Sequence, residues 1–342
     1  MKKFLKITAA ILAIIIIFSP VIIIGSMIFG LPSQHRASYV GQLNNKVSRL
    51  YSIEEEKVVV IGGSSVAFAL DSELMERELG MPVVNFGLYA ALGTKLMLDL
   101  SRSAIGEGDV VVISPELDPQ TMSLYFSAEQ TLRALDDDYR MFFDIATDDK
   151  LSLLGGAWRF ATDKLEIIRT GRVIDPPGVY NAGNLDERGD LTYPTPENVM
   201  PDYYDSNKII TLGEDMIDGE FIDYLNEYID YCKRLGATVL FAYCPMNELA
   251  IESPYSDEEK NAAARREFHE YLSSVISCEI IGSIEEAIMD AAYFYDSNFH
   301  LNDAGRRTRT IGLTEDILSA LNIDSSVNED LPEKPPLPRA EG

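Results

Sequence analysis

Short apolar runs alternate along most of this chain with polar segments of helical spacing. The runs, mostly Val, Ile and other apolar residues, are 57–61, 82–86, 109–113, 237–243 and 278–281. Such short continuous runs are typical of strands buried on both faces of a parallel sheet. Helical spacing is seen over Asp71 to Leu79 and over 93–104, about 220–235, 257–275 and 304–321. Because strands alternating with helices indicate βαβ units, the pattern predicts an α/β fold.

The first apolar run is much longer than the others. Lys2, Lys3 and Lys6 precede an uncharged apolar stretch from Ile7 to Leu31. A membrane-spanning helix needs about 20 apolar residues, whereas the apolar region of a secretory signal has about 7 to 15. No small-x-small cleavage site ends the run, so we expect an uncleaved transmembrane anchor, with a cleaved signal peptide as the alternative.

Both alternatives predict the same compartment for the rest of the chain. Basic flanks stay on the cytoplasmic side, so the residues after the anchor should lie outside the cytoplasm. We therefore expect a single-pass protein of the cell membrane, with the lipid bilayer as a partner through the N-terminal helix.

The alternation breaks over about 119–219, which we interpret as a long insertion within one domain. Its centre, from Pro176 to Pro201, is rich in turn residues and should be irregular. The predicted organisation is a basic flank (1–6), a transmembrane anchor (7–31), a juxtamembrane connector (32–56), an α/β domain (57–323) and a disordered tail (324–342).

Composition narrows the range of partners. The formal net charge is −26, and nucleic-acid binding needs clustered Lys and Arg, so nucleic acid is excluded as an expected partner. The chain has three cysteines and no pair with CxxC spacing, so a structural zinc site is not expected, although one disulfide is an alternative. The Ser/His/Asp mechanism considered below implies no metal or cofactor. We interpret Cys232, Cys244 and Cys278 as small buried residues near strands.

Polar residues that could take part in catalysis or binding follow the predicted strands. Gly62-Gly63-Ser64-Ser65 comes after the first strand, and Asn85-Phe86-Gly87 closes the second. The segment from Asp296 to His300 comes just before the last helix. Because ligand sites in open parallel sheets form at the carboxyl ends of the strands, we expect these segments to share one rim.

A serine needs a base to act as a nucleophile, and the base gains from an orienting carboxylate. Of the three histidines, His35 lies beside the predicted membrane segment. His269 lies among charged residues of a helix and is expected to be exposed at the surface. His300 follows Asp296 in a turn near the strand ends. The order of these pieces favours a Ser/His/Asp site over the alternative of ordinary turns and a helix cap.

These residues resemble the SGNH, or GDSL-like, hydrolase superfamily. Its first block, Gly-x-Ser after the first strand, matches Gly62-Gly63-Ser64, and its second block supplies a glycine that matches Gly87. Its last block, an Asp and a His before the C-terminal helix, matches Asp296 and His300. The resemblance covers about 57–117 and 237–320, and it implies a flavodoxin-like, three-layer α/β/α fold around a parallel sheet.

The resemblance also implies roles. Ser64 would attack an acyl carbonyl, His300 would take its proton, Asp296 would orient His300, and the N–H groups of Ser64 and Gly87 would form the oxyanion hole. The stretch from Gly62 to Asp71 is similar to membrane-anchored bacterial members that act beside membrane-bound O-acyltransferases, in teichoic acid D-alanylation and exopolysaccharide acetylation. The implied function is ester hydrolysis or acyl transfer on a cell-envelope glycan. The alternative is a catalytically weak scaffold that partners a membrane-bound O-acyltransferase.

The sequence departs from the family pattern at three points. The third block, Gly-x-Asn after the third strand, is replaced by Ser114-Pro115-Glu116-Leu117-Asp118. The usual Asp-x-x-His has one residue more, and Ser65 offers a second serine register. Asn247 is a candidate for the missing oxyanion donor. The candidate substrate contacts are Ser65, Asn85, Glu116 and Asn247.

Overall fold

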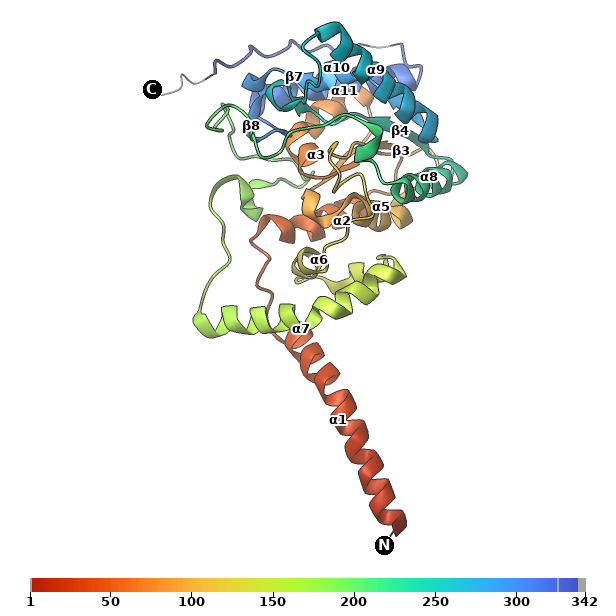
Figure 1. The fold of residues 1–342 in the computed structure, drawn as a ribbon, viewed down its shortest axis with the longest axis vertical. Coiled ribbons are helices and arrows are strands. Elements are labelled where there is room, and N and C mark those ends of the chain that lie inside the picture. The colour runs from red at the N-terminus through yellow and green to blue at the C-terminus, as the bar shows by residue number, and fades with distance from the viewer. Residues whose placement is uncertain (1, 325, 338–342) are drawn as a thin grey trace.

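The computed structural model describes residues 2–324 and 326–337, which form a mixed α/β domain carried on a long N-terminal helix (Figure 1). Within these residues the central sheet has five parallel strands in the order β2-β1-β3-β4-β6. The strands are β1 (Val58–Gly62), β2 (Val83–Gly87), β3 (Val110–Ile113), β4 (Thr238–Ala242) and β6 (Glu279–Ile281). Each predicted apolar run forms one of them, so the expectation of an α/β fold with a parallel sheet is confirmed.

Strand β1 is paired on both sides, since Val60 lies opposite Asn85 of β2 and Val112 of β3. The chain leaves β1 in one direction along the sheet to reach β2 and in the other to reach β3. Crevices form at such a switch point outside the carboxyl ends of the strands. The sheet therefore directs a site to the ends of β1 and β3.

Both faces of the sheet are buried, because successive side chains of a strand point to opposite faces. On one face, Val59, Ile61 and Val111 join a core with residues of several helices. These are α2 (Leu43–Ser52), α5 (Thr94–Ser101), α8 (Gly219–Arg234) and α9 (Glu258–Val275). On the other face, Val60 and Val112 pack with residues of α3 (Ser64–Ala69), α4 (Ser72–Leu79) and α11 (Asp303–Ala320).

The predicted juxtamembrane connector belongs to the folded domain. Helix α2 occupies its second half, and Leu43 and Leu50 of this helix are fully buried. These residues lie on one face at a spacing of two helical turns, so α2 can pack flat against its neighbours. The connector is thus part of the core on one side of the sheet.

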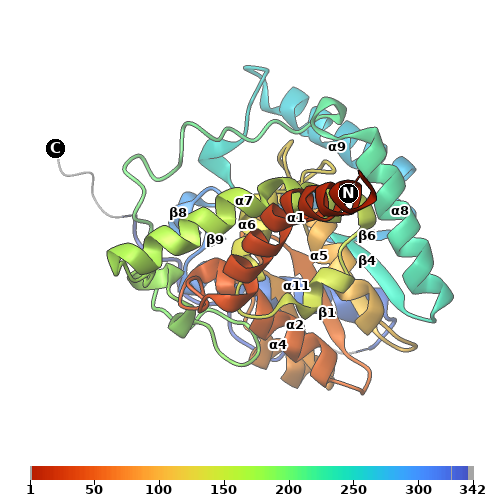
Figure 2. The same cartoon turned by 90° about the horizontal axis from the view of Figure 1, so that it is seen from below.

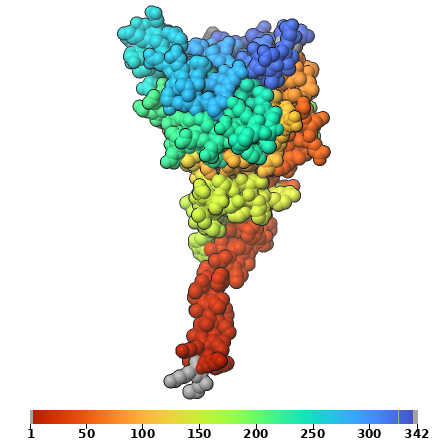
Figure 3. Space-filling model, turned by 90° about the vertical axis from the view of Figure 1, so that its right-hand side faces the viewer, coloured from red at the N-terminus to blue at the C-terminus, as the bar shows by residue number. Residues whose placement is uncertain are grey.

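The N-terminal helix α1 (Lys2–Gly30) is long and apolar enough to cross a membrane. In Figure 3 it projects from the domain as a stalk. Pro20 has no N–H for the carbonyl of Ile16, and the Ser19 hydroxyl donates to that carbonyl at 3.3 Å instead. The helix continues past Pro20 without a break.

The insertion contributes α6 (Ala128–Ala134) and α7 (Thr147–Thr170), and α7 lies across the end of α1 (Figure 1). From Pro176 to Pro201 the chain forms no α-helix or β-strand, as predicted. Smaller elements are α10 (Ile284–Ala287), β5 (Met246–Asn247), β7 (Ile288–Met289), β8 (Phe294–Ser297) and β9 (His300–Leu301). Single 3₁₀ turns are η1 (Tyr39–Gln42), η2 (Ala90–Leu92), η3 (Arg102–Ala104), η4 (Tyr139–Phe143), η5 (Gly178–Tyr180), η6 (Ala182–Asn184), η7 (Glu214–Met216), η8 (Glu248–Ala250) and η9 (Ala291–Tyr293).

The predicted tail runs over the domain in its described part. Residues 326–337 form no helix or strand, yet Glu329 pairs with Arg77 of α4 and Arg307 of α11. Of the cysteines, Cys232 and Cys244 are buried thiols, whereas Cys278 is partly exposed.

Candidate active site

A cavity of about 770 Å³ has residues from the carboxyl ends of β1 and β3 in its wall. Ser64, Glu116, Asp296 and His300 all line it. The cavity therefore brings together the serine, histidine and aspartate that the sequence pattern singled out. Other parts of the wall come from the connector and the insertion, which carry Tyr39 and Tyr180.

Two glycines allow the turn that carries Ser64. A Cβ atom on Gly62 would lie 2.4 Å from the Ser114 carbonyl oxygen, and one on Gly63 would lie 2.2 Å from the Glu116 carboxylate. Both distances are far below contact, so only glycine lets the ends of β1 and β3 approach this closely. Ser64 follows directly as the first residue of α3.

The two serine registers differ in their surroundings. Ser64 reaches the cavity, whereas Ser65 is fully buried and does not line it. The Ser65 N–H donates to the Glu116 carboxylate at 2.8 Å, and its hydroxyl lacks a partner in the described structure. Ser64 is therefore the better placed of the two to meet a bound molecule.

His300 and Asp296 form a close pair despite their unusual spacing. Strands β8 and β9 make a hairpin in which Ser297 lies opposite His300. This hairpin places the Asp296 carboxylate 2.7 Å from His300 Nδ1. The extra residue relative to Asp-x-x-His is therefore absorbed by the turn, and Nε2 is the ring nitrogen left for proton transfer.

Aromatic side chains hold this pair in position. Phe68 of α3 stacks on the His300 ring with centroids 4.1 Å apart and an angle of 8° between the planes. The Tyr180 hydroxyl donates to the second Asp296 oxygen at 2.7 Å. Burial raises the pKa of Asp296, but the hydrogen bonds from His300 and Tyr180 outweigh it and hold that pKa below its ordinary value. Asp296 is thus kept as a carboxylate.

Sequence reasoning did not find Tyr180 or the stacking of Phe68. Tyr180 lies in the irregular part of the insertion, where no periodicity places a side chain. Phe68 lies within the stretch from Gly62 to Asp71 that carries the family resemblance, but nothing in the sequence places its ring on His300. The i, i+4 spacing of Ser64 and Phe68 on a short helix was the one available signal, since it puts both on one face.

Ser64 and His300 share the cavity without a direct hydrogen bond in the described structure. The Ser64 hydroxyl donates instead to Glu116 Oε1 at 3.3 Å. The hydrogen bond of about 2.6–3.2 Å that a nucleophilic serine makes with its base is therefore not formed in this conformation. A hydrogen bond from Ser64 to His300 therefore requires the Ser64 hydroxyl to leave Glu116.

Glu116 stands where the family has its Gly-x-Asn block. Its side chain is buried, Oε1 accepts from Ser64 and Ser65, and Oε2 has no partner among the described residues. Burial raises the pKa of Glu116, and the Ser65 N–H partly offsets this effect. Asp118 adds to the increase, while His300 opposes it.

The remaining candidates belong to the scaffold of the fold. The Gly87 N–H donates to the Asn85 side chain at 3.2 Å, so it is occupied in this conformation. The Asn85 amide donates in turn to Asp190 of the insertion at 2.9 Å. Asn247 donates to the Tyr203 carbonyl at 2.8 Å and caps η8. Neither asparagine lines the cavity, so neither predicted substrate contact is found there.

His269 is also placed differently from the prediction. It is half-buried rather than exposed, and its Nδ1 lies 2.7 Å from the Tyr243 hydroxyl. It does not line the cavity. In the described part of the chain, no group of three or more His, Cys, Asp or Glu side chains is arranged to hold a metal ion.

No protein-family model matches the chain, and no curated protein matches it significantly. Functional inference therefore depends on the cavity itself: a serine at a strand end, a histidine paired with a carboxylate, and a buried glutamate between them.

Proposed function

We propose that this chain is an SGNH-type serine esterase or O-acyltransferase, anchored in the cell membrane and acting outside the cytoplasm on a cell-envelope glycan. The observation that carries the proposal is the single cavity lined by Ser64 and by the Asp296–His300 pair. Ser64 lies near the beginning of the domain in sequence and the Asp296–His300 pair near its end, and both line the same cavity.

The fold supports this assignment. Numbered within the sheet, the strand order is 2-1-3-4-5, which is the flavodoxin-like order. Helices on both faces are in keeping with a three-layer α/β/α domain. The serine and the glutamate flank the switch point, where such folds bind ligands.

The chemistry follows from the residues. Ser64 Oγ attacks the acyl carbonyl carbon, and its proton passes to His300 Nε2 while the carbonyl electrons move onto oxygen. Collapse of this intermediate expels the leaving alkoxide, which takes the proton from His300. Water or a glycan hydroxyl then attacks the acyl-serine and gives its proton to His300; the bond between the acyl carbon and Ser64 Oγ breaks, and Oγ takes the proton back from His300. Asp296 stabilises the imidazolium through Nδ1–H.

The wall of the cavity suits a carbohydrate. Tyr89 and Tyr180 offer aromatic surfaces to the apolar faces of sugar rings, and Gln120, Gln130 and Asp118 offer hydrogen-bonding groups. A partly apolar wall with a small number of convergent polar groups is typical of binding sites for small molecules.

The end of α1 supports an uncleaved anchor. The Ile28 carbonyl accepts hydrogen bonds from Lys164 at 2.9 Å and from Tyr139 at 3.1 Å. Removal of α1 would leave the buried Lys164 with only Asp136 as a partner. The basic residues before the apolar stretch favour a cytoplasmic N-terminus.

A scaffold function is the second candidate, and one observation favours it. Ser64 donates to Glu116 rather than to His300, and the Gly87 N–H is already bonded. In this alternative the domain binds the glycan or a membrane-bound O-acyltransferase without turnover.

Labelling with a fluorophosphonate probe separates the two candidates. We expect the full chain to be labelled, Ser64→Ala to abolish labelling, and Ser65→Ala to retain it as the matched control. Asp296→Asn should slow labelling by up to about 10⁴-fold, since it disturbs the histidine tautomer. Absence of labelling in the native chain, or labelling that depends on neither serine, would favour the scaffold. Labelling that survives Ser64→Ala but is lost in Ser65→Ala would assign the nucleophile to Ser65 instead.

A further inference from the structure

Helix α7 is apolar on two opposite faces. On the inner face, Leu153, Phe160 and Ile167 are buried against the domain. On the outer face, Leu151, Leu154, Trp158 and Leu165 are 67%, 68%, 57% and 45% exposed. These four positions recur at intervals of three, four and seven residues, so they form one stripe along the helix. Phe143 before the helix and Val173 after it are 78% and 79% exposed.

A stripe of this kind needs a covering surface. Soluble proteins rarely expose contiguous large apolar patches, and a helix that is apolar all round is normally enclosed on all sides. Single exposed leucines are ordinary, but here the exposed apolar residues follow one face of a 24-residue helix.

The position of α7 identifies what covers it. Lys164, on its inner face, donates to the Ile28 carbonyl in the last turn of α1. About 20 residues suffice to cross the hydrocarbon core, so α1 has enough length to bring this turn to the bilayer surface. Figure 1 shows α7 crosswise between the domain and α1, and Figure 2, from below, shows it on the underside beside α1.

Charge and side-chain type agree with this position. The helix contains four basic residues (Lys150, Arg159, Lys164, Arg169) and four acidic ones (Asp148, Asp149, Asp163, Glu166), so its formal charge is zero. The whole chain has a formal net charge of −26. Because α7 itself is neutral, anionic headgroups repel this helix less than they repel the rest of the chain. Tryptophan favours the interface between headgroups and acyl chains.

We infer that α7 is an interfacial helix that lies in the outer surface of the membrane and buries the stripe of Leu151, Leu154, Trp158 and Leu165 among the lipids. The inference rests on α1 spanning the bilayer, as proposed above. Interfacial helices bury their apolar face about 5–10 Å into the boundary between headgroups and acyl chains. The domain would then have two attachments to the membrane, and its orientation would be fixed.

The test uses the single tryptophan of the chain, Trp158. The full chain is reconstituted into vesicles of phosphatidylcholine and phosphatidylglycerol, and vesicle flotation confirms that α1 is inserted. We expect blue-shifted Trp158 emission that is quenched by lipids brominated near the headgroup and shielded from aqueous iodide.

Variants separate the helix face from the anchor. Leu151→Glu combined with Leu154→Glu should restore iodide quenching severalfold while flotation is unchanged. Val199→Glu, at a site that is 55% exposed elsewhere on the domain, should change neither readout. If the native chain floats but Trp158 remains open to iodide and insensitive to brominated lipid, the interfacial helix is refuted and a protein partner becomes the better explanation. Failure to float would refute the anchor, and this inference with it.

Discussion

Glu116 is the residue at which this site departs most from the family it resembles. Its carboxylate holds Ser64 Oγ and the Ser65 N–H, so it ties the serine turn to the end of β3. A carboxylate beside a nucleophile disfavours negative charge on a neighbouring oxyanion, whereas a neutral carboxyl group does not. The protonation state of Glu116 therefore bears on both stability and reactivity.

Replacing Glu116 with Gln should change how folding stability depends on pH. Burial raises the pKa of Glu116 above its ordinary 4.5, so the folded protein holds the proton more tightly than the unfolded chain. Stability then falls as pH rises from 4.5 through the raised pKa. The stability of Glu116→Gln relative to the native chain should therefore increase between pH 4 and pH 8, by about 1.4 kcal/mol for each unit of increase in pKa.

Urea denaturation of the full chain in detergent at several pH values measures this difference. Glu187→Gln, at an exposed position on the insertion, serves as the control and should show no such trend. If the difference in free energy of unfolding between Glu116→Gln and the native chain stays constant with pH, the pKa of Glu116 is not raised by folding and this prediction is wrong.

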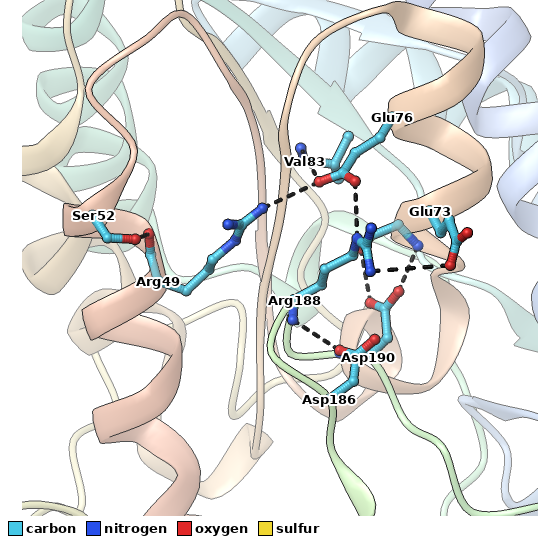
Figure 4. A network of polar contacts seen from close by, with 9 residues as sticks. Arg49, Ser52, Glu73, Glu76, Val83, Asp186, Arg188 and Asp190 are labelled. Atoms are coloured by element: carbon cyan, nitrogen blue, oxygen red, sulfur yellow. Dashed lines mark hydrogen bonds and ion pairs between the residues drawn. The ribbon is translucent and has the colours of Figure 1, made fainter.

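At the scale of elements, the insertion is fastened to the sheet by a polar network. Figure 4 shows Arg188 directed at Glu76 of α4, and Asp190 near the same helix. Arg188 Nε lies 2.8 Å from Glu76, and Asp190 accepts from Asn85 at 2.9 Å and from the Ser72 hydroxyl at 2.8 Å. The buried Lys46 of α2 donates to the Gly189 carbonyl at 2.7 Å.

Replacing Asp190 with Ala should destabilise the protein by about 3 kcal/mol, because it leaves buried partners without an acceptor and Lys46 without its compensating charge. The loosened segment begins a few residues after Tyr180, so labelling of Ser64 should also slow. Denaturation and probe kinetics measure the two effects. Glu187→Ala is the matched control. If Asp190→Ala and Glu187→Ala have the same stability and the same labelling rate, the network does not hold the insertion in place.

The central strands β1 and β3 could be predicted because each is a continuous apolar run, which is typical of a strand buried on both faces. The runs 57–61 and 109–113 correspond to β1 and β3 within one residue at each end. Helix α2 is harder to predict, because Leu43 and Leu50 lie in a mostly polar segment after the predicted transmembrane span. Its packing is decided by the sheet, which local sequence does not reveal.

The candidate site was predictable only in part. Ser64, Asp296 and His300 could be selected because strand ends and turns impose positions on them. The contacts of Asn85 and Asn247 could not be, since their partners Asp190 and Tyr203 lie in the insertion. Asn85, for example, bonds Asp190, which is distant in sequence and lies in an irregular segment.

For the whole molecule, the prediction concerns topology. With the lysines of the N-terminus in the cytoplasm and α1 uncleaved, protease added to spheroplasts should digest the domain. Peptide mapping of the mature protein should recover residues before Ile28, because this residue is bonded to Lys164 and Tyr139. Full protection from protease would mean that the domain lies in the cytoplasm. A mature protein whose N-terminus lies beyond Gly30 would mean that the anchor is removed.

If the proposed function holds, the hydrogen bond between Lys164 and the Ile28 carbonyl also limits how the domain can reach a substrate. A domain on a long flexible linker can sample a large volume above the membrane. A domain hydrogen-bonded to the end of its own transmembrane helix can reorient only together with that helix. Ser38, in the cavity wall, follows the end of α1 so closely that extended chain could carry it no more than about 30 Å away. If α1 spans the bilayer, the cavity stays at a fixed distance from the membrane surface. Lateral diffusion then brings it only to acceptor groups that lie at that distance.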